Sequence, residues 1–360
     1  MATEKMHFKN LNGLRFIAAF LVIVGHFHQT RANYGLSGIW DSLVIQGFGE
    51  EGVNIFFVLS GFLITILLLQ EKKESQSISL KNFYARRILR IWPLYFLIIG
   101  FCFFAVPRIG ALYVPGMEIN ASHFWQSLIV FACILPSFAM HLFGQIPLAS
   151  MTWSIGVEEV FYLITPLLLK YSRRALPSFL IFSAAFLFLG NGFITNPSGN
   201  RALGVLILFL ADLRLACLGL GSLAAIVYFH YPDWVKKWIL NVPAQVMAYA
   251  LALGFILKLY SPGWYSNELF SLYFAVIVLN LALNPSSFLR LTHPVFEYLG
   301  KVSYGIYMFH IFPIVLLCNL WPGANIWLAF ALDMGITVGL AALSYQYFER
   351  YFLGLKKHFH

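Results

Sequence analysis

The chain has 360 residues, of which 60% are hydrophobic, 18% are aromatic and 11% are charged. Soluble globular domains carry about 25% charged residues, so this composition excludes an ordinary soluble protein and indicates a polytopic membrane protein. The net charge of +9 does not indicate a nucleic-acid partner, because the basic residues fall in short loops between apolar runs.

Ten apolar runs are long enough to cross a bilayer, which takes about 20 helical residues. In chain order they are 11–28, 52–70, 90–107, 154–170, 176–192, 203–229, 240–260, 268–284, 302–320 and 325–348. The sequence therefore predicts an all-α fold, a polytopic transmembrane helix bundle of about ten spans. We expect one integral membrane domain over residues 1–360 and no fused soluble domain.

Lysine and arginine indicate the orientation, because they collect in cytoplasmic loops. With ten spans, nearly all of them fall on one side, which predicts a multi-pass protein of the cell (inner) membrane with cytoplasmic N- and C-termini. Segment 124–140 is also apolar, but a full crossing there would invert every later loop. We therefore expect it to be re-entrant or to lie in the outer interface.

The first apolar run, LNGLRFIAAFLVIVGH, carries Arg15 and His26. Ionisable side chains inside a span are costly and usually functional. On one helix the two residues lie about 16 Å apart along the axis, at ~1.5 Å per residue, so Arg15 would serve the inner half of the membrane and His26 the outer half. Imidazole suits proton transfer near neutral pH, although a histidine at a span end can also simply sit among headgroups.

The fourth run begins with two adjacent acids, Glu158 and Glu159, after Trp153. Acids near a helix N-terminus are favoured by the helix dipole, which would explain one of them. Two successive residues point about 100° apart, so at least one should face the bundle interior. We expect them in the same leaflet as His26, where a carboxylate could fix the tautomer of the ring.

Three arginines, Arg86, Arg87 and Arg90, precede the third run. They could be plain topological charges. Arg87 and Arg90 share a helical face, and guanidinium groups match phosphate oxygens in pairs. A phosphorylated donor could therefore dock here.

Two further ionisable sites lie in apolar runs. His310 is deep in the ninth run and should be bonded to a partner. Arg214 and Asp212 are close in sequence and form either an internal ion pair or a ligand site. Ser60 is a conceivable acyl-accepting nucleophile, but the sequence shows no base near it.

Taken together, these stretches resemble the acyltransferase-3 family of integral membrane acyltransferases, which modify sugars of O-antigens, exopolysaccharides, peptidoglycan and some antibiotics. The resemblance covers nearly the whole chain and runs through LNGLRFIAAFLVIVGH, GEEGVNIFFVLSGFLIT, FYARRILRIWPLY, TWSIGVEEVFYLITP and LGKVSYGIYMFH. It implies a ten-span bundle, a cytoplasmic acyl-CoA donor and an extracytoplasmic acceptor hydroxyl. It also implies an essential histidine in the first span and an Arg-x-x-Arg pair near the donor.

Two features depart from the family pattern. His310 is followed by Ile311, Phe312 and Pro313, where the family often has His-x-Pro. No hydrolase-like domain follows within the sequence, so we expect the membrane domain alone, or a separate protein, to complete the transfer.

The resulting prediction is a membrane O-acyltransferase with acyl-CoA, expected to be acetyl-CoA, as co-substrate and no metal. The acceptor would be a carbohydrate or glycolipid hydroxyl, in a setting of membrane lipid and without nucleic acid. His26 would be the general base, oriented by Glu158 or Glu159. The donor-binding candidates are Arg15, Arg86, Arg87 and Arg90, and the remaining candidates are Trp153, Arg214, Tyr304 and His310.

Two alternatives stay open. A proton-coupled transporter could use His26, Glu158 and His310 as a proton path, but the sequence shows no inverted repeat of the kind common in transporters. A scaffold or sensor would have no need of so many buried ionisable residues. The acceptor, the acyl chain, a covalent acyl-enzyme and the oligomeric state are left undetermined.

Overall fold

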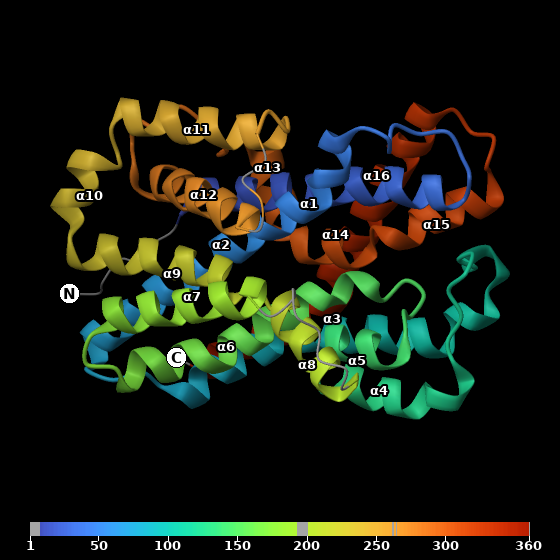
Figure 1. The fold of residues 1–360 in the computed structure, drawn as a ribbon, viewed down its shortest axis with the longest axis horizontal. Helices are drawn as coiled ribbons and strands as arrows, with labels where there is room; N and C mark the ends of the chain where they lie inside the picture. The colour runs from blue at the N-terminus through green and yellow to red at the C-terminus, as the bar shows by residue number, and fades with distance from the viewer. Residues whose placement is uncertain (1–7, 193–200, 261–262, 264, 360) are drawn as a thin grey trace.

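The computed structural model describes residues 8–192, 201–260, 263 and 265–359, and this part of the chain contains helices and no strand (Figure 1). The α-helices are α1 (Lys9–Asn33), α2 (Leu43–Ser75), α3 (Leu80–Phe104), α4 (Phe124–Ala132), α5 (Pro136–Phe143), α6 (Trp153–Tyr171), α7 (Ala175–Gly192), α8 (Arg201–Asp212), α9 (Leu215–His230), α10 (Pro232–Trp238), α11 (Val242–Ile256), α12 (Ser266–Leu283), α13 (Pro294–Lys301), α14 (Ser303–Phe309), α15 (Ile311–Leu320), α16 (Ile326–Ser344) and α17 (Arg350–Leu355). Short 3-10 turns lie at Val106–Arg108, Gly110–Leu112, Ala121–His123, Ser150–Thr152 and Lys356–His358, and a π-helical turn at Tyr345–Glu349.

Within the described residues, eight helical stretches are long and apolar enough to cross a membrane. The pair α10 and α11, bent by 72°, would make a ninth, and α7 is a shorter apolar helix. Each predicted run coincides with one or two of these helices, so the prediction of an all-α transmembrane bundle is confirmed. The number of ten crossings stays a prediction.

Segment 124–140 forms two short helices rather than one span. α4 has nine residues and α5 begins after a break at Cys133–Leu135, where Ile134 adopts a φ of +59°. A nine-residue helix is about 14 Å long, less than half of the ~30 Å hydrocarbon thickness. This geometry agrees with a re-entrant or interfacial segment; the face to which it returns stays a prediction.

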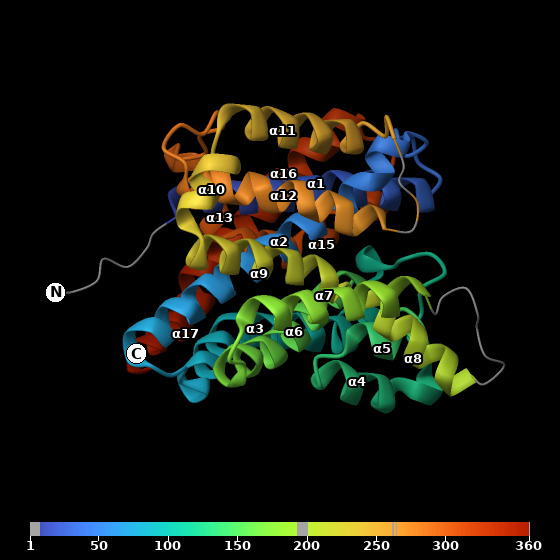
Figure 2. The ribbon, with the colours of Figure 1, turned by 60° about the vertical axis from the view of Figure 1, so that its left-hand side comes forward.

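The helices form two groups that meet along α2 and α9 (Figure 2). One group contains α11, α12 and α16, and the other contains α3 to α6. The central helix α2 packs against α1, α9, α12 and α6, so it contacts both groups. α17 lies toward the end of the bundle where α1 begins (Figure 2).

The helices α1 and α2 touch through their backbones at two levels. A Cβ atom added to Gly52 would lie 2.6 Å from the carbonyl oxygen of Ala18, and one added to Gly25 would lie 2.7 Å from the backbone nitrogen of Gly49. Small residues permit this close approach of membrane helices. The contact fixes α1, which carries both Arg15 and His26, against the centre of the bundle.

Candidate active site

A cavity lies between α1, α2, α3, α6 and α14, and we name it the arginine cavity. Arg15, Arg87 and Arg90 line it, together with a single carboxylate, that of Glu158. None of these three guanidinium groups forms a salt bridge within the described residues. The remaining lining is largely apolar and aromatic, including Phe56, Phe57, Leu63, Ile64, Tyr304 and Tyr307. An excess of fixed positive charge inside a membrane bundle suits an anionic ligand.

Glu158 is held inside this cavity by two hydroxyl groups. Ser60 Oγ donates to Glu158 Oε1 at 2.6 Å, and the Tyr162 hydroxyl donates to Oε2 at 3.0 Å. The guanidinium of Arg87 lies over the Tyr162 ring, 5.4 Å from its centroid. The sequence showed no base near Ser60, whereas the fold brings a carboxylate to it from α6.

Glu159 points elsewhere, because it follows Glu158 by about 100° around the helix. Its Oε2 accepts a hydrogen bond from Trp92 Nε1 at 3.1 Å. Neither glutamate forms a hydrogen bond with His26, since their partners Ser60, Trp92 and Tyr162 lie on α2, α3 and α6. The expected contact between a glutamate and the His26 ring is therefore not formed, and this prediction is corrected.

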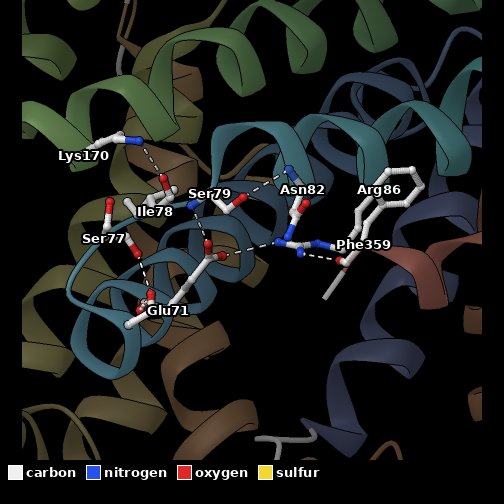
Figure 3. Close-up of polar contacts among 9 residues, drawn as sticks. Glu71, Ser77, Ile78, Ser79, Asn82, Arg86, Lys170 and Phe359 are labelled. Carbon is white, nitrogen blue, oxygen red and sulfur yellow. Dashed lines mark hydrogen bonds and ion pairs between the residues drawn. The ribbon is translucent and has the colours of Figure 1, made fainter.

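Arg86 does not line the arginine cavity; Figure 3 shows its side chain beside Glu71 and Phe359. Its Nη2 pairs with Glu71 Oε2 at 3.3 Å, and its Nη1 donates to the Phe359 carbonyl at 2.9 Å. Glu71 also accepts from the backbone nitrogen of Ser79 at 2.7 Å. Arg86 thus ties α3 to the end of α2 and to the C-terminal segment, and it does not join Arg15, Arg87 and Arg90 in the arginine cavity.

His26 lines a second hollow, which we name the histidine pocket. It lies between α1, α15 and the segments 114–117 and 145–151. Besides His26, the residues that line it are Gln29, Thr30, Asn33, Tyr34, Val114, Met117, Gln145, Leu148, Ser150, Met151, Ile311 and Val315. Asn319 Nδ2 donates to the carbonyl of Tyr113 at 2.9 Å, and the Tyr34 hydroxyl donates to the same carbonyl. These bonds hold the 106–117 segment over the pocket.

The second histidine, His310, is the partner of His26. His26 Nδ1 and His310 Nε2 are 2.7 Å apart, and His310 Nδ1 lies 2.6 Å from the Tyr307 carbonyl. A carbonyl only accepts, so His310 Nδ1 carries the hydrogen and its Nε2 is the acceptor in the neutral ring. His26 Nδ1 must then donate to His310, which leaves Nε2 of His26 unprotonated. The arrangement gives His26 the tautomer that a general base requires.

A thin layer of side chains separates the two hollows. The Tyr307 hydroxyl lies 2.7 Å from Ser154 Oγ and donates to the Met151 carbonyl at 2.8 Å. Tyr307 and Ser154 line the arginine cavity, whereas Met151 lines the histidine pocket. Residues from α6 and α14 therefore form the partition between them.

The remaining candidates have different surroundings. Tyr304 lines the arginine cavity, and its hydroxyl donates to the Ile91 carbonyl at 2.9 Å. Arg214 pairs with Glu50 at 2.7 Å and lies 5.3 Å over the ring of Trp153. The pair of Arg214 with Asp212 is not formed, because the helix breaks at Arg214, with φ +41°. Asp212 contacts His141 instead, at 2.8 Å.

Sequence reasoning missed three residues at the site. Ser60 was set aside, and Tyr162 and Tyr307 lay within the quoted motifs without a role. The sequence feature that could have identified such residues is a hydroxyl side chain one helical turn from an ionisable residue, as Tyr162 is from Glu158. No group of three His, Cys, Asp or Glu side chains in the described residues could hold a metal ion.

Residues 8–346 match the sequence profile of the acyltransferase domain family Acyl_transf_3. Among curated proteins, "Putative O-acetyltransferase SACOL0978" of Staphylococcus aureus strain COL is 27% identical over 376 residues, and "O-acetyltransferase OatA" of Staphylococcus aureus strain NCTC 8325 is 26% identical over 373 residues. Each alignment covers 96% of this chain but only 57% and 58% of the relative, so the chain spans less than three-fifths of the length of these proteins. No solved structure matches it. Because the family profile matches nearly the whole chain, the protein belongs to the acyltransferase-3 family of acyl-transferring enzymes.

Proposed function

We propose that this protein is a membrane O-acyltransferase that moves an acyl group, expected to be acetyl, from cytoplasmic acyl-CoA to a hydroxyl of a glycan or glycolipid on the opposite face. The observation that carries the proposal is the pair of hollows beside α1. One is lined by three arginines that form no salt bridge with a described residue, and the other by a histidine whose Nδ1 donates to a second histidine. Two relatives are named as a putative O-acetyltransferase and an O-acetyltransferase, which supports an acetyl group.

The arginine cavity suits the phosphates of the donor. The planar guanidinium groups of Arg15, Arg87 and Arg90 can each bind two phosphate oxygens at once. The apolar and aromatic lining of α2 suits the uncharged arm that carries the thioester. Arg86 would stay outside this site, because Glu71 and the Phe359 carbonyl hold it.

The histidine pocket suits the acceptor. Nε2 of His26 takes the proton of the acceptor hydroxyl while the hydroxyl oxygen attacks the thioester carbonyl carbon. The carbon–sulfur bond then breaks, and the imidazolium returns the proton to the departing thiolate. His310 stabilises the imidazolium, because its Nε2 accepts from His26 Nδ1 throughout. The products are the O-acyl ester and free CoA thiol.

The thioester must come within ~3–3.5 Å of the acceptor oxygen. Arg15 and His26 lie about 16 Å apart along α1, so the donor has to extend from one hollow into the other. The Tyr307 and Ser154 hydroxyls stand in its path. On this proposal, those two side chains move aside when the donor binds.

The orientation is part of the proposal, with the arginine cavity facing the cytoplasm. Its test is labelling of single cysteines in a variant that lacks the four native ones. Gln145→Cys, in the histidine pocket, should react with an impermeant maleimide in intact cells, and Arg174→Cys should react only after permeabilisation. The reverse pattern would invert the topology.

The activity is tested with the protein in lipid nanodiscs and acetyl-CoA, and with whole cells. A strain lacking the gene should lose an O-acetyl group from its glycans, seen as a loss in mass that the intact gene restores. Unchanged glycans in the deletion strain, with no acetyl-CoA binding by the protein, would refute the proposal. A proton-path transporter gains no support, because Glu158 lines the arginine cavity whereas His26 lines the histidine pocket.

A further inference from the structure

A third hollow lies where α2, α6 and α9 end and α7 begins. In Figure 1 these helix ends gather toward the left of the molecule. Four cationic residues line the hollow, and its lining contains no carboxylate; the lining includes Lys72, Lys73, Gln76, Ser172, Arg173, Arg174, Ala175, Leu176, His230 and Tyr231. We name it the basic hollow.

One of the four cations already has a structural role. Lys72 Nζ donates to the carbonyls of Leu169 at 2.5 Å and Ser172 at 3.3 Å, and so it caps the C-terminal end of α6. Lys73, Arg173 and Arg174 form no salt bridge with any described carboxylate. The first turn of α7, Ala175 onward, also lines the hollow and adds the positive end of its helix dipole.

An apolar groove continues from the basic hollow along α6. Ile164, Leu167, Leu168 and Tyr171 line it from successive turns, and Ser172 lines both the groove and the hollow. These positions share one face of the helix and lead from its end toward the middle of the span. The exposed Leu167 and Tyr171 indicate that this face meets lipid.

We propose that the basic hollow and its groove bind one anionic phospholipid, with the headgroup phosphate among Lys73, Arg173 and Arg174 and an acyl chain along α6. Basic pockets between membrane helices suit such headgroups. A soluble phosphate would leave the groove unused. The amine of a zwitterionic headgroup would find no carboxylate in the lining, so an anionic headgroup is preferred. The bound lipid would contact the same helix that carries Glu158.

The test is native mass spectrometry of the whole protein in detergent, titrated with phosphatidylglycerol or with phosphatidylcholine of the same chains. Phosphatidylglycerol should bind at least about tenfold more tightly, and the triple variant Lys73→Gln, Arg173→Gln, Arg174→Gln should weaken it by roughly 10–100-fold. The matched control is Lys236→Gln, Lys237→Gln, Lys357→Gln, which removes the same charge outside the hollow and should leave the affinity unchanged. Equal losses in both triple variants would overturn the proposal in favour of general charge attraction.

The groove is tested separately. Leu167→Trp should fill it and weaken phosphatidylglycerol, whereas Leu163→Trp, an exposed position on α6 outside the groove, should not. Excess inorganic phosphate should not displace the lipid. If inorganic phosphate displaces it fully, or if Leu167→Trp binds like the original protein, the site holds a phosphate only and no lipid chain.

Discussion

The arginine cavity and the histidine pocket are served by one helix, α1, yet their chemistry is opposite. The cavity holds guanidinium groups whose charge is fixed, whereas the pocket holds an imidazole whose proton can move. A fixed charge is suited to binding a ligand, and a titratable ring is suited to transferring a proton during a reaction. Because of this difference, donor affinity and the rate of the chemical step should be separable by mutation, although both depend on residues of the same helix.

The largest effect should come from His26→Ala. A positioned general base contributes ~10²–10⁴-fold, so the rate of acyl transfer at saturating acetyl-CoA should fall by that factor, with acetyl-CoA affinity little changed. The measurement is release of free CoA thiol by the protein in nanodiscs, with acetyl-CoA affinity from calorimetry.

His28→Asn is the matched control for His26. His28 is buried, and its Nδ1 accepts a weak hydrogen bond from the Ile39 backbone at 3.4 Å, a contact that an asparagine oxygen can reproduce. It does not line the histidine pocket, so this variant should transfer acyl groups at nearly the original rate. If the His26→Ala protein keeps the original rate, His26 is not the general base.

The next largest effect concerns the donor. Arg87→Ala or Arg90→Ala should weaken acetyl-CoA binding, because each removes a charge-assisted contact of ~1.5–3 kcal/mol. Lysine at either position should restore the affinity only in part, since it lacks the planar fork. Arg86→Ala should bind acetyl-CoA normally, because its partners lie outside the cavity. Equal weakening in all three alanine variants would mean that total charge, rather than the cavity, attracts the donor.

A smaller effect is expected at His310, which acts through His26. His310→Phe removes the acceptor for His26 Nδ1 and should lower the transfer rate by ~10–100-fold, as loss of an orienting partner does elsewhere. His310→Gln keeps an acceptor oxygen and should recover part of the rate. A rate profile against pH should shift in the phenylalanine variant and return in the glutamine variant, which a loss of packing alone would not produce.

The smallest effect should come from Glu158→Gln. The change removes a negative charge from the arginine cavity, so acetyl-CoA affinity should rise by a few-fold, while the transfer rate at saturation changes by less than about tenfold. Glu159→Gln, whose carboxylate faces Trp92, should change the affinity less. A large loss of rate in Glu158→Gln with normal acetyl-CoA binding would place Glu158 in the chemical step.

The sequence was sufficient for the membrane class and the helices, and it singled out the ionisable residues on which the proposed function rests. A charged side chain in an apolar run stands out because the surrounding composition makes it costly, and this picked out Arg15, His26, Glu158 and His310. The family membership followed from the order of motifs. Secondary structure in a bilayer is strongly constrained, since each backbone group must be paired within the span.

The partners of those residues could not be predicted. His26 and His310 are 284 positions apart, and only the packing of α1 against α14 and α15 brings them together. The partners of Glu158 could not be predicted either. We expected a carboxylate bonded to the His26 ring, but the packing of α6 against α2 places Glu158 with Ser60 in the arginine cavity. The different surroundings of Arg86 and Arg87 have a local cause. The two side chains point about 100° apart around the helix, so Arg87 lines the arginine cavity and Arg86 does not.

The continuity of α1 has a consequence for the choice of donor. Arg15 and His26 lie on one unbroken helix, so a rise of ~1.5 Å per residue sets about 16 Å between them along the axis, and the close contacts at Gly25 and Gly52 pack this helix against α2. On the proposed mechanism, a donor must be long enough to place its phosphates beside Arg15 and its thioester beside His26. Acetyl phosphate is too short to reach both residues at once, so it should bind without delivering its acetyl group to the acceptor.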